Sequence, residues 1–201
     1  MPATGPRELA TERFIIDRAA SRFTVQAFST GLLSAFGHNP TIAMRDYAGQ
    51  VDFVPGSYRH ASLRLTVQTR TLEVADEMKR DDRTTLENTM RTEVLDVEHY
   101  PDAVYQSDRI EVETVGDDSL NARVAGELAL HGVIRPLGFE ARVENMGARL
   151  RISGQFTLRQ SDYGIKPVSF AAGALRLKDE LKFSFEVVAR KAEPRNGDSQ
   201  V

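Results

Sequence analysis

The sequence contains no cysteine. Disulfide bonds, thiolate metal ligands and a cysteine nucleophile are therefore excluded. No run of apolar residues reaches the roughly 18 that a transmembrane helix needs, and the N-terminal stretch MPATGPRELATERF lacks the apolar core of a secretory signal. We therefore expect a cytoplasmic protein with no integral membrane association. A periplasmic location is the alternative if a signal has been removed.

Neither sign of charge dominates, because 26 Lys and Arg face 29 Asp and Glu in 201 residues. The basic residues are scattered rather than gathered in a stripe, so we expect no nucleic-acid partner. The length suits one domain with a sizeable core. Residues 1–12 and 192–201 are polar and lack periodicity, which predicts disordered tails around a folded domain of residues 13–191.

Alternation of apolar and polar residues dominates this domain. In SLRLTVQ (62–68) and LKFSFEV (181–187) the apolar residues share one face and the charges lie on the other. Turn-forming stretches such as VPGS and SDYG separate the alternating runs. The pattern predicts antiparallel sheet with one solvated face, which must stack as two sheets or close into a barrel. A barrel of about eight strands can be filled by side chains or hold one small ligand.

Two segments do not alternate, STGLLSAFG (29–37) and DEMKRDDRTTLENTMRTEVL (76–95). Leu86, Met90 and Val94 in the second are spaced four apart, as on one face of a helix. We predict that both segments are helical.

Catalytic and metal-binding patterns are missing. The four histidines have no ligand spacing between them, and no G-x-S-x-G or phosphate-binding loop occurs; they are His38, His60, His99 and His131. Asp96, Glu98 and His99 could form an acid–base cluster, but they lie between a predicted helix and a predicted strand, which favours a solvated connection. We therefore expect no metal site and no catalytic residues.

The stretch GELALHGVIRPLGFEARV (126–143) has two alternating halves around a bend. It resembles the signature hairpin of the YceI-like family of lipid-binding proteins, in which a strand ends in an L-H-G-V-T-[RK]-P turn. Further segments resemble other motifs of this family in the family order, namely FIIDRAASRFTVQAF, GQVDFVPGS, VLDVEHYPDAVYQS and LRQSDYGI. Together they span Phe14 to Ala189, nearly the whole predicted domain.

The resemblance implies an all-β protein, an antiparallel eight-stranded closed barrel similar to lipocalins with one or two short helices. It also implies a long apolar channel that holds an isoprenoid or similar chain, with no other cofactor. On this interpretation His131, Gly132 and Arg135 are turn residues and Pro136 starts the next strand. Some relatives carry a second histidine shortly after the equivalent of His38, where this chain has Asn39 and Pro40, and this departure speaks against a metal.

The leading hypothesis is a non-enzymatic carrier that holds a long apolar lipid. The expected channel wall consists of inward residues of the strands, Phe23, Val25, Val51, Phe53, Leu65, Val67, Ile152, Phe156, Phe183 and Phe185, and the expected mouth or cover of Leu33, Phe36, Leu86, Met90 and Phe170.

Alternatives stay open at this point. A filled barrel that binds a protein partner needs the same inward residues, and an enzyme acting on a small apolar substrate has the least support. Gly49, Gly126 and Gly154 on the inward faces either leave interior space or mark bends. The edges of an imperfectly closed barrel and the resemblance also favour a homodimer.

Overall fold

The computed structural model describes residues 10–30, 39–167, 169–170 and 175–193. The strands are β1 (Glu12–Ile16), β2 (Arg22–Thr30), β3 (Thr41–Met44), β4 (Tyr47–Val54), β5 (Ser57–Gln68), β6 (Leu72–Val74), β7 (Asp102–Gly116), β8 (Ser119–Leu130), β9 (Val133–Asn145), β10 (Arg149–Arg159), β11 (Ser169–Phe170) and β12 (Leu175–Lys191). The helical elements are α1 (Arg80–Thr89), the 3₁₀ turns η1 (Arg18–Ala20), η2 (Thr69–Thr71) and η4 (Gln160–Tyr163), and the π-helical turn η3 (Met90–Val94).

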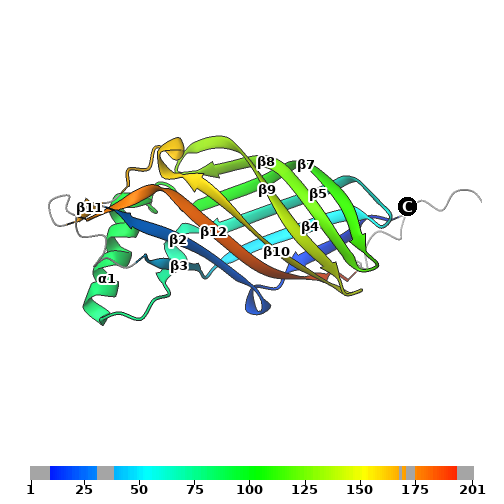
Figure 1. Cartoon of the computed structure of the whole chain (residues 1–201), viewed down its shortest axis with the longest axis horizontal. Coiled ribbons are helices and arrows are strands. Elements are labelled where there is room, and N and C mark those ends of the chain that lie inside the picture. Colours follow the sequence, from blue (N-terminus) through cyan, green and yellow to red (C-terminus); the bar gives the residue numbers. More distant parts are fainter. Residues whose placement is uncertain (1–9, 31–38, 168, 171–174, 194–201) are drawn as a thin grey trace, which may run out of the picture.

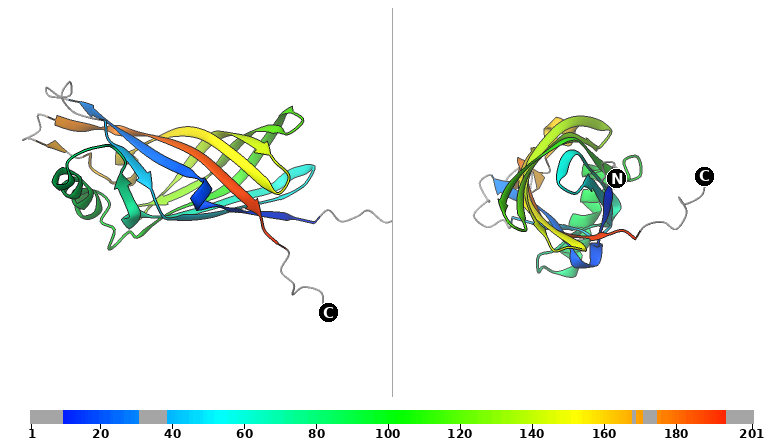
Figure 2. Two further views of the ribbon diagram at one scale, coloured as in Figure 1. Left: turned by 90° about the horizontal axis from the view of Figure 1, so that it is seen from below. Right: turned by 90° about the vertical axis from the view of Figure 1, so that its right-hand side faces the viewer.

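The strands form a closed antiparallel barrel. Pairing runs in the order β1-β4-β5-β7-β8-β9-β10-β12, and β12 pairs back to β1, which closes a ring of eight strands. Strands β2, β3 and β6 extend β1, β4 and β5 beyond short kinks and pair in the order β12-β2-β3-β6. The view along the long axis shows the ring, and α1 lies at one end of it (Figures 1 and 2). The predicted fold class is confirmed.

The alternation seen in the sequence separates the interior from the surface. Phe14 of β1 is 1% exposed, and its ring stacks on that of Phe53 at 5.4 Å. On the outside, neighbouring strands carry opposite charges, such as Arg123 with Glu140. Because such exposed pairs each contribute only about 0–1 kcal/mol, the apolar inward face supplies most of the stability.

The family-like motif GELALHGVIRPLGFEARV forms the hairpin between β8 and β9. His131 and Gly132 both have positive φ, 50° and 75°, as a two-residue type I′ turn requires. The His131 ring lies 4.3 Å from that of Tyr100, on the connection before β7. The interpretation of His131 and Gly132 as turn residues is therefore confirmed.

Two further expectations for this hairpin are wrong, because β9 begins at Val133. Arg135 is a strand residue that pairs with Leu128 of β8 and not a turn residue, and Pro136 lies inside the strand and does not start it. Pro136 pairs with Glu127 of β8. On the other side of β9, pairing with β10 starts only at Glu140. The missing N–H of Pro136 therefore interrupts no ladder, which is the condition under which proline is tolerated inside a strand.

The inward glycines do not create the interior space. A Cβ atom at Gly126 would lie 2.2 Å from the carbonyl oxygen of Gln106, and one at Gly154 would lie 2.6 Å from the Phe185 ring. At Gly49 the same position lies 2.6 Å from Ile16. These glycines allow neighbouring chain segments to approach closely, so their role is in packing and closure of the barrel.

The prediction of a helical segment at 76–95 is confirmed for residues 80–94, which form α1 and η3, and is wrong for 76–79 and 95. The second segment predicted as helical is 29–37. The prediction is wrong at Ser29 and Thr30, because these residues pair with β12 and form the end of strand β2. Residues 31–37 lie outside the described residues. Residues 1–9 and 194–201 also lie outside the described residues, so the disorder expected of the two tails stays a prediction. Strand β1 begins at Glu12, which is the last residue of the predicted N-terminal tail.

The helical segment formed by α1 and η3 is held against the free edge of β6 by two charged side chains, Glu87 of α1 and Arg91 of η3. Glu87 accepts a hydrogen bond from the backbone N–H of Val74 at 3.0 Å. Arg91 donates to the carbonyl oxygens of Leu72 at 3.3 Å and Arg70 at 3.1 Å, and the two side chains form an ion pair at 3.2 Å. Glu87 and Arg91 therefore form hydrogen bonds with backbone groups at this edge that a further strand would otherwise pair with.

Replacement of Glu87 by alanine should lower the free energy of unfolding by about 1–3 kcal/mol, because the Val74 N–H and the Arg91 guanidinium both lose a partner. Chemical denaturation measures this change. Asn88→Ala, at the neighbouring exposed position of the same helix, is the control. An equal effect of both substitutions would show that the edge contact contributes nothing.

Candidate ligand-binding channel

A cavity of about 310 Å³ lies inside the barrel. At the α1 end its lining includes Leu86, Met90 and Val94, and at the opposite end it reaches Tyr58 and Asn145 beside the hairpins. The volume falls at the lower end of the range of known small-molecule sites, about 300–1,000 Å³. The interior is therefore not completely filled by side chains.

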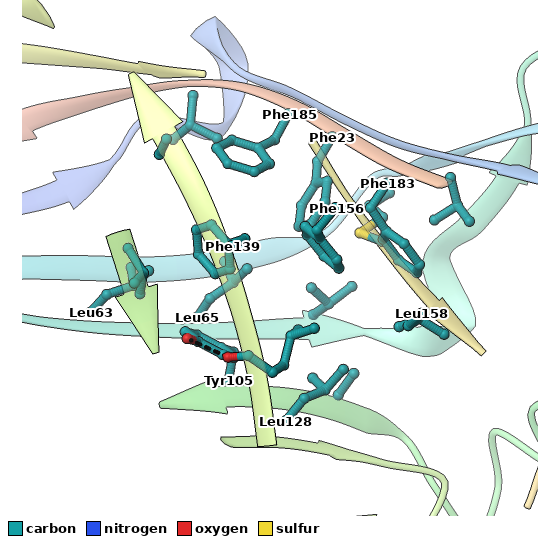
Figure 3. A pocket seen from close by; sticks show the side chains of 18 of the residues that line it. Phe23, Leu63, Leu65, Tyr105, Leu128, Phe139, Phe156, Leu158, Phe183 and Phe185 are labelled. Atoms are coloured by element: carbon teal, nitrogen blue, oxygen red, sulfur yellow. Dashed lines mark hydrogen bonds between the residues drawn. The ribbon is translucent and has the colours of Figure 1, made fainter. Parts of the chain in front are cut away.

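Aromatic rings of β2, β9, β10 and β12 lie together in the wall of the cavity (Figure 3). The rings of Phe156 and Phe183 are stacked 4.7 Å apart, and Phe139 lies 5.6 Å from Phe156. Phe185 contacts Phe23 edge to face at 6.0 Å, in the space that Gly154 leaves beside it. Rings in such contact stabilise one another beyond their burial, so these contacts add to the stability of this part of the wall.

Three polar side chains in the wall, those of Tyr105, Thr69 and Gln160, form hydrogen bonds within the protein. The Tyr105 hydroxyl donates to the carbonyl oxygen of Leu137 at 3.2 Å (Figure 3), and burial raises the pKa of Tyr105 to about 12. At the α1 end, the Thr69 hydroxyl donates to the Pro101 carbonyl at 2.8 Å, and the Gln160 amide to that of Lys178 at 3.0 Å. Among the described lining residues there is no Asp, Glu, Lys, Arg or His.

The histidines that the structure describes lie away from the cavity lining. His99 is exposed and pairs with Asp96 at 2.8 Å, on the connection between η3 and β7, as predicted for a solvated turn. This pairing raises the pKa of His99. His38 falls in a part of the chain that is not described. Within the described ranges, no three His, Asp or Glu side chains are grouped so that they could hold a metal ion.

The expected channel wall can be compared with the observed lining. Leu33 and Phe36 lie outside the described residues, and only the backbone of Phe170, in β11, is described. The remaining expected residues all line the cavity, although their contact with a ligand stays a prediction; they are Phe23, Val25, Val51, Phe53, Leu65, Val67, Leu86, Met90, Ile152, Phe156, Phe183 and Phe185.

Sequence reasoning left out the wall formed by β7, β8 and β9. Their inward residues line the cavity as well, namely Tyr105, Ile110, Val112, Ala122, Val124, Leu128, Leu137, Phe139, Ala141 and Val143. These strands alternate as clearly as the others, so the same signal could have found them. Thr69 and Gln160 carry no such signal, because each lies in a short 3₁₀ turn.

A closed antiparallel barrel around an uncharged apolar cavity is the architecture of proteins that hold small apolar ligands. Residues 14–189 match the model of the YceI-like domain family. The chain therefore belongs to the YceI-like family, as its motifs suggested.

Relatives of known sequence support this membership. A UPF0312 protein of Pseudomonas savastanoi pv. phaseolicola is 26% identical over 184 residues, which cover 89% of this chain and 87% of the relative. A UPF0312 protein of Pseudomonas putida is 35% identical over 103 residues, or 48% of this chain and 50% of the relative. The match to the Pseudomonas putida protein thus spans about half the length of each chain.

Solved structures share the fold. Burkholderia cenocepacia BcnA superposes with a TM-score of 0.66 at 18% identity, over 86% of this chain and 98% of BcnA. A polyisoprenoid binding domain from Saccharophagus degradans, implicated in plant cell wall breakdown, superposes with a TM-score of 0.65 at 14% identity, over 92% of this chain and all of that domain. In the described ranges, no helix has the length and apolar character to cross a membrane.

The buried phenol of Tyr105 should make the barrel sensitive to alkali. Between pH 10.0, the ordinary pKa of tyrosine, and about 12, the unfolded chain loses this proton and the folded chain keeps it. The free energy of unfolding should therefore fall as the pH rises through this window. Denaturation below and within the window measures the slope, and Tyr105→Phe should make it shallower. An unchanged slope in the variant would contradict this assignment.

Proposed function

We propose that the protein binds a long apolar lipid, an isoprenoid or similar chain, inside the barrel and carries or sequesters it. The observation that carries the proposal is the uncharged apolar cavity that extends from α1 to the opposite hairpins. The polyisoprenoid binding domain of Saccharophagus degradans, which has the same fold, supports the choice of ligand class.

The physical basis of such binding is burial of apolar surface. A chain that buries about 300 Å² gains roughly 7 kcal/mol at 25 cal/mol per Å², before the costs of association. The hydroxyl of Tyr105 and the side chains of Thr69 and Gln160 already bond within the protein, so few polar groups remain to recognise a ligand. The selectivity should therefore rest on length and width rather than on hydrogen bonds.

Two other functions receive less support. An enzyme needs a titrating group beside its substrate, and the ionisable side chains in the described lining are two tyrosines, Tyr58 and Tyr105. A filled barrel that acts only through its outer face does not account for a cavity of about 310 Å³.

Organic extraction of the protein from its native host, followed by mass spectrometry, tests the proposal. A stoichiometric apolar lipid is the expected result. Protein that is purified without any extractable lipid, and that takes up none from added isoprenoid, would contradict the carrier function and favour the filled barrel.

A substitution that fills the channel gives a second test. Leu65 lines the cavity, whereas Arg64 next to it is exposed. Leu65→Trp should displace lipid and keep most of the stability, because the larger side chain enters space that a ligand occupied. In a close-packed interior the same change would cost about 1–3 kcal/mol. Thermal midpoint and extracted lipid per protein are measured for the parent, for Leu65→Trp and for the outward control Arg64→Trp.

A further inference from the structure

The wall of the barrel has a gap between β5 and β7. These strands pair only from Arg64 with Gln106 to Gln68 with Asp102. Beyond this ladder, residues 57–63 of β5 and 107–116 of β7 have no backbone pairing with each other. We call these two stretches the β5–β7 gap. It lies at the end opposite α1, where the β4–β5 and β7–β8 hairpins project (Figures 1 and 2).

A β-bulge accounts for the divergence of the two strands. The register of β7 against β8 shifts between Ser107 and Arg109, so β7 turns away from β5 at this point. The last link between β5 and β7 uses a side chain, because the N–H of Leu63 donates to the Ser107 hydroxyl at 2.8 Å. The end of the ladder is thus held by one hydrogen bond that the Ser107 hydroxyl accepts.

Other interruptions of the barrel wall are covered. Glu87 and Arg91 cover the edge of β6, as described above. Where β9 and β10 part, η4 and the residues after it fill the space: Arg135 donates to the Asp162 carbonyl at 3.3 Å, and Tyr163 and Ile165 are 2% and 4% exposed. In the part of the chain that the structure describes, no comparable element pairs with the β5–β7 gap.

Both sides of the gap belong to the wall of the cavity. Ala61 and Leu63 on β5, and Ile110 and Val112 on β7, line the cavity and are each only half-buried. Strands without a ladder between them part without loss of backbone hydrogen bonds, whereas the covered α1 end is tied by the contacts of Glu87 and Arg91. The gap is therefore the part of the wall that opens at the lowest cost.

We propose that the β5–β7 gap is a lateral portal through which an apolar chain enters and leaves the channel. This inference rests on the proposed function, because it requires that the cavity take up such a chain. The unpaired edges could also receive a strand from a second copy of the protein, and the test below separates that outcome from passage of a ligand.

The absence of cysteine makes the portal directly testable, because two introduced thiols are the only ones in the protein. In Ser62→Cys/Arg109→Cys the thiols lie on the outer faces of β5 and β7, where a flexible, reducible bis-maleimide can join them. The control is Asn121→Cys/Arg142→Cys, which joins directly paired, exposed positions of β8 and β9. The probe is cis-parinaric acid, a fatty acid whose apolar tail is fluorescent and whose head is a carboxylate, with binding and release followed by stopped flow.

Cross-linking the gap should slow both binding and release of the probe by about tenfold or more and leave Kd unchanged, because a portal alters the barrier and not the bound state. Reduction of the linker should restore the rates, and the β8–β9 cross-link should leave them unchanged. Ser107→Ala removes the last link to Leu63 and should therefore make both binding and release of the probe faster. This variant needs no cross-linker.

Unchanged rates in the cross-linked protein, with the probe still bound, would overturn the portal and leave the carrier function intact, with entry at the α1 end. Failure of the parent protein to bind the probe or isoprenoid would overturn both proposals. If cross-linking instead converts a dimer to a monomer in light scattering and leaves the rates unchanged, the gap is an interface between copies and the portal is excluded.

Discussion

Closure of the sheet by the short ladder between β1 and β12 is the constraint on which the rest of the structure depends. Only three residue pairs form it, Phe14–Lys191, Ile15–Arg190 and Ile16–Ala189. Because the ring is closed, inward side chains reach solvent only along the axis of the barrel and at the β5–β7 gap. A slip of one residue in this pairing would turn charged side chains such as Arg190 into the apolar interior. The cost of burying these charges therefore fixes the register. The buried Ala189, with 0% exposure, lies at this junction.

The barrel differs along its axis because three of its strands are kinked. Between β1 and β2, β3 and β4, and β5 and β6 the chain leaves the ladder for a few residues. One half of the molecule is thus a ring of eight strands, and in the other half β6 ends the sheet beside α1. The cover and the β5–β7 gap lie at opposite ends as a result, and the cavity connects these two regions.

Most of the fold could be predicted from the sequence, because alternation and turn residues act over a few neighbours. The strand SLRLTVQ and the turn at His131 and Gly132 are examples in which local pattern and structure agree. The start of β9 was missed because Pro136 is tolerated only where β10 does not pair, and this depends on a distant strand. For the same reason the sequence gives no sign that Glu87 and Arg91 bind the edge of β6.

The candidate site was predictable in its residues but not in its volume. Phe156 and Phe183 would be inward-facing in a filled barrel and in a hollow one. The difference depends on how their rings stack against each other and on the space that Gly154 leaves for Phe185. These are contacts between strands, and they are set by rotamers and twist rather than by composition.

The lack of charged side chains among the described residues of the channel wall has a consequence for the conditions under which a ligand would be retained. On the proposed function, a bound chain meets no Asp, Glu, Lys, Arg or His among these residues, so its binding releases no counterions from the wall. Acidity and ionic strength therefore have little influence on occupancy. Temperature has a larger one, because burial of apolar surface carries a negative heat-capacity change. If the proposed function holds, such a barrel would retain an apolar chain without depending on charge pairing, and the enthalpy of retention would change steadily as the temperature rises.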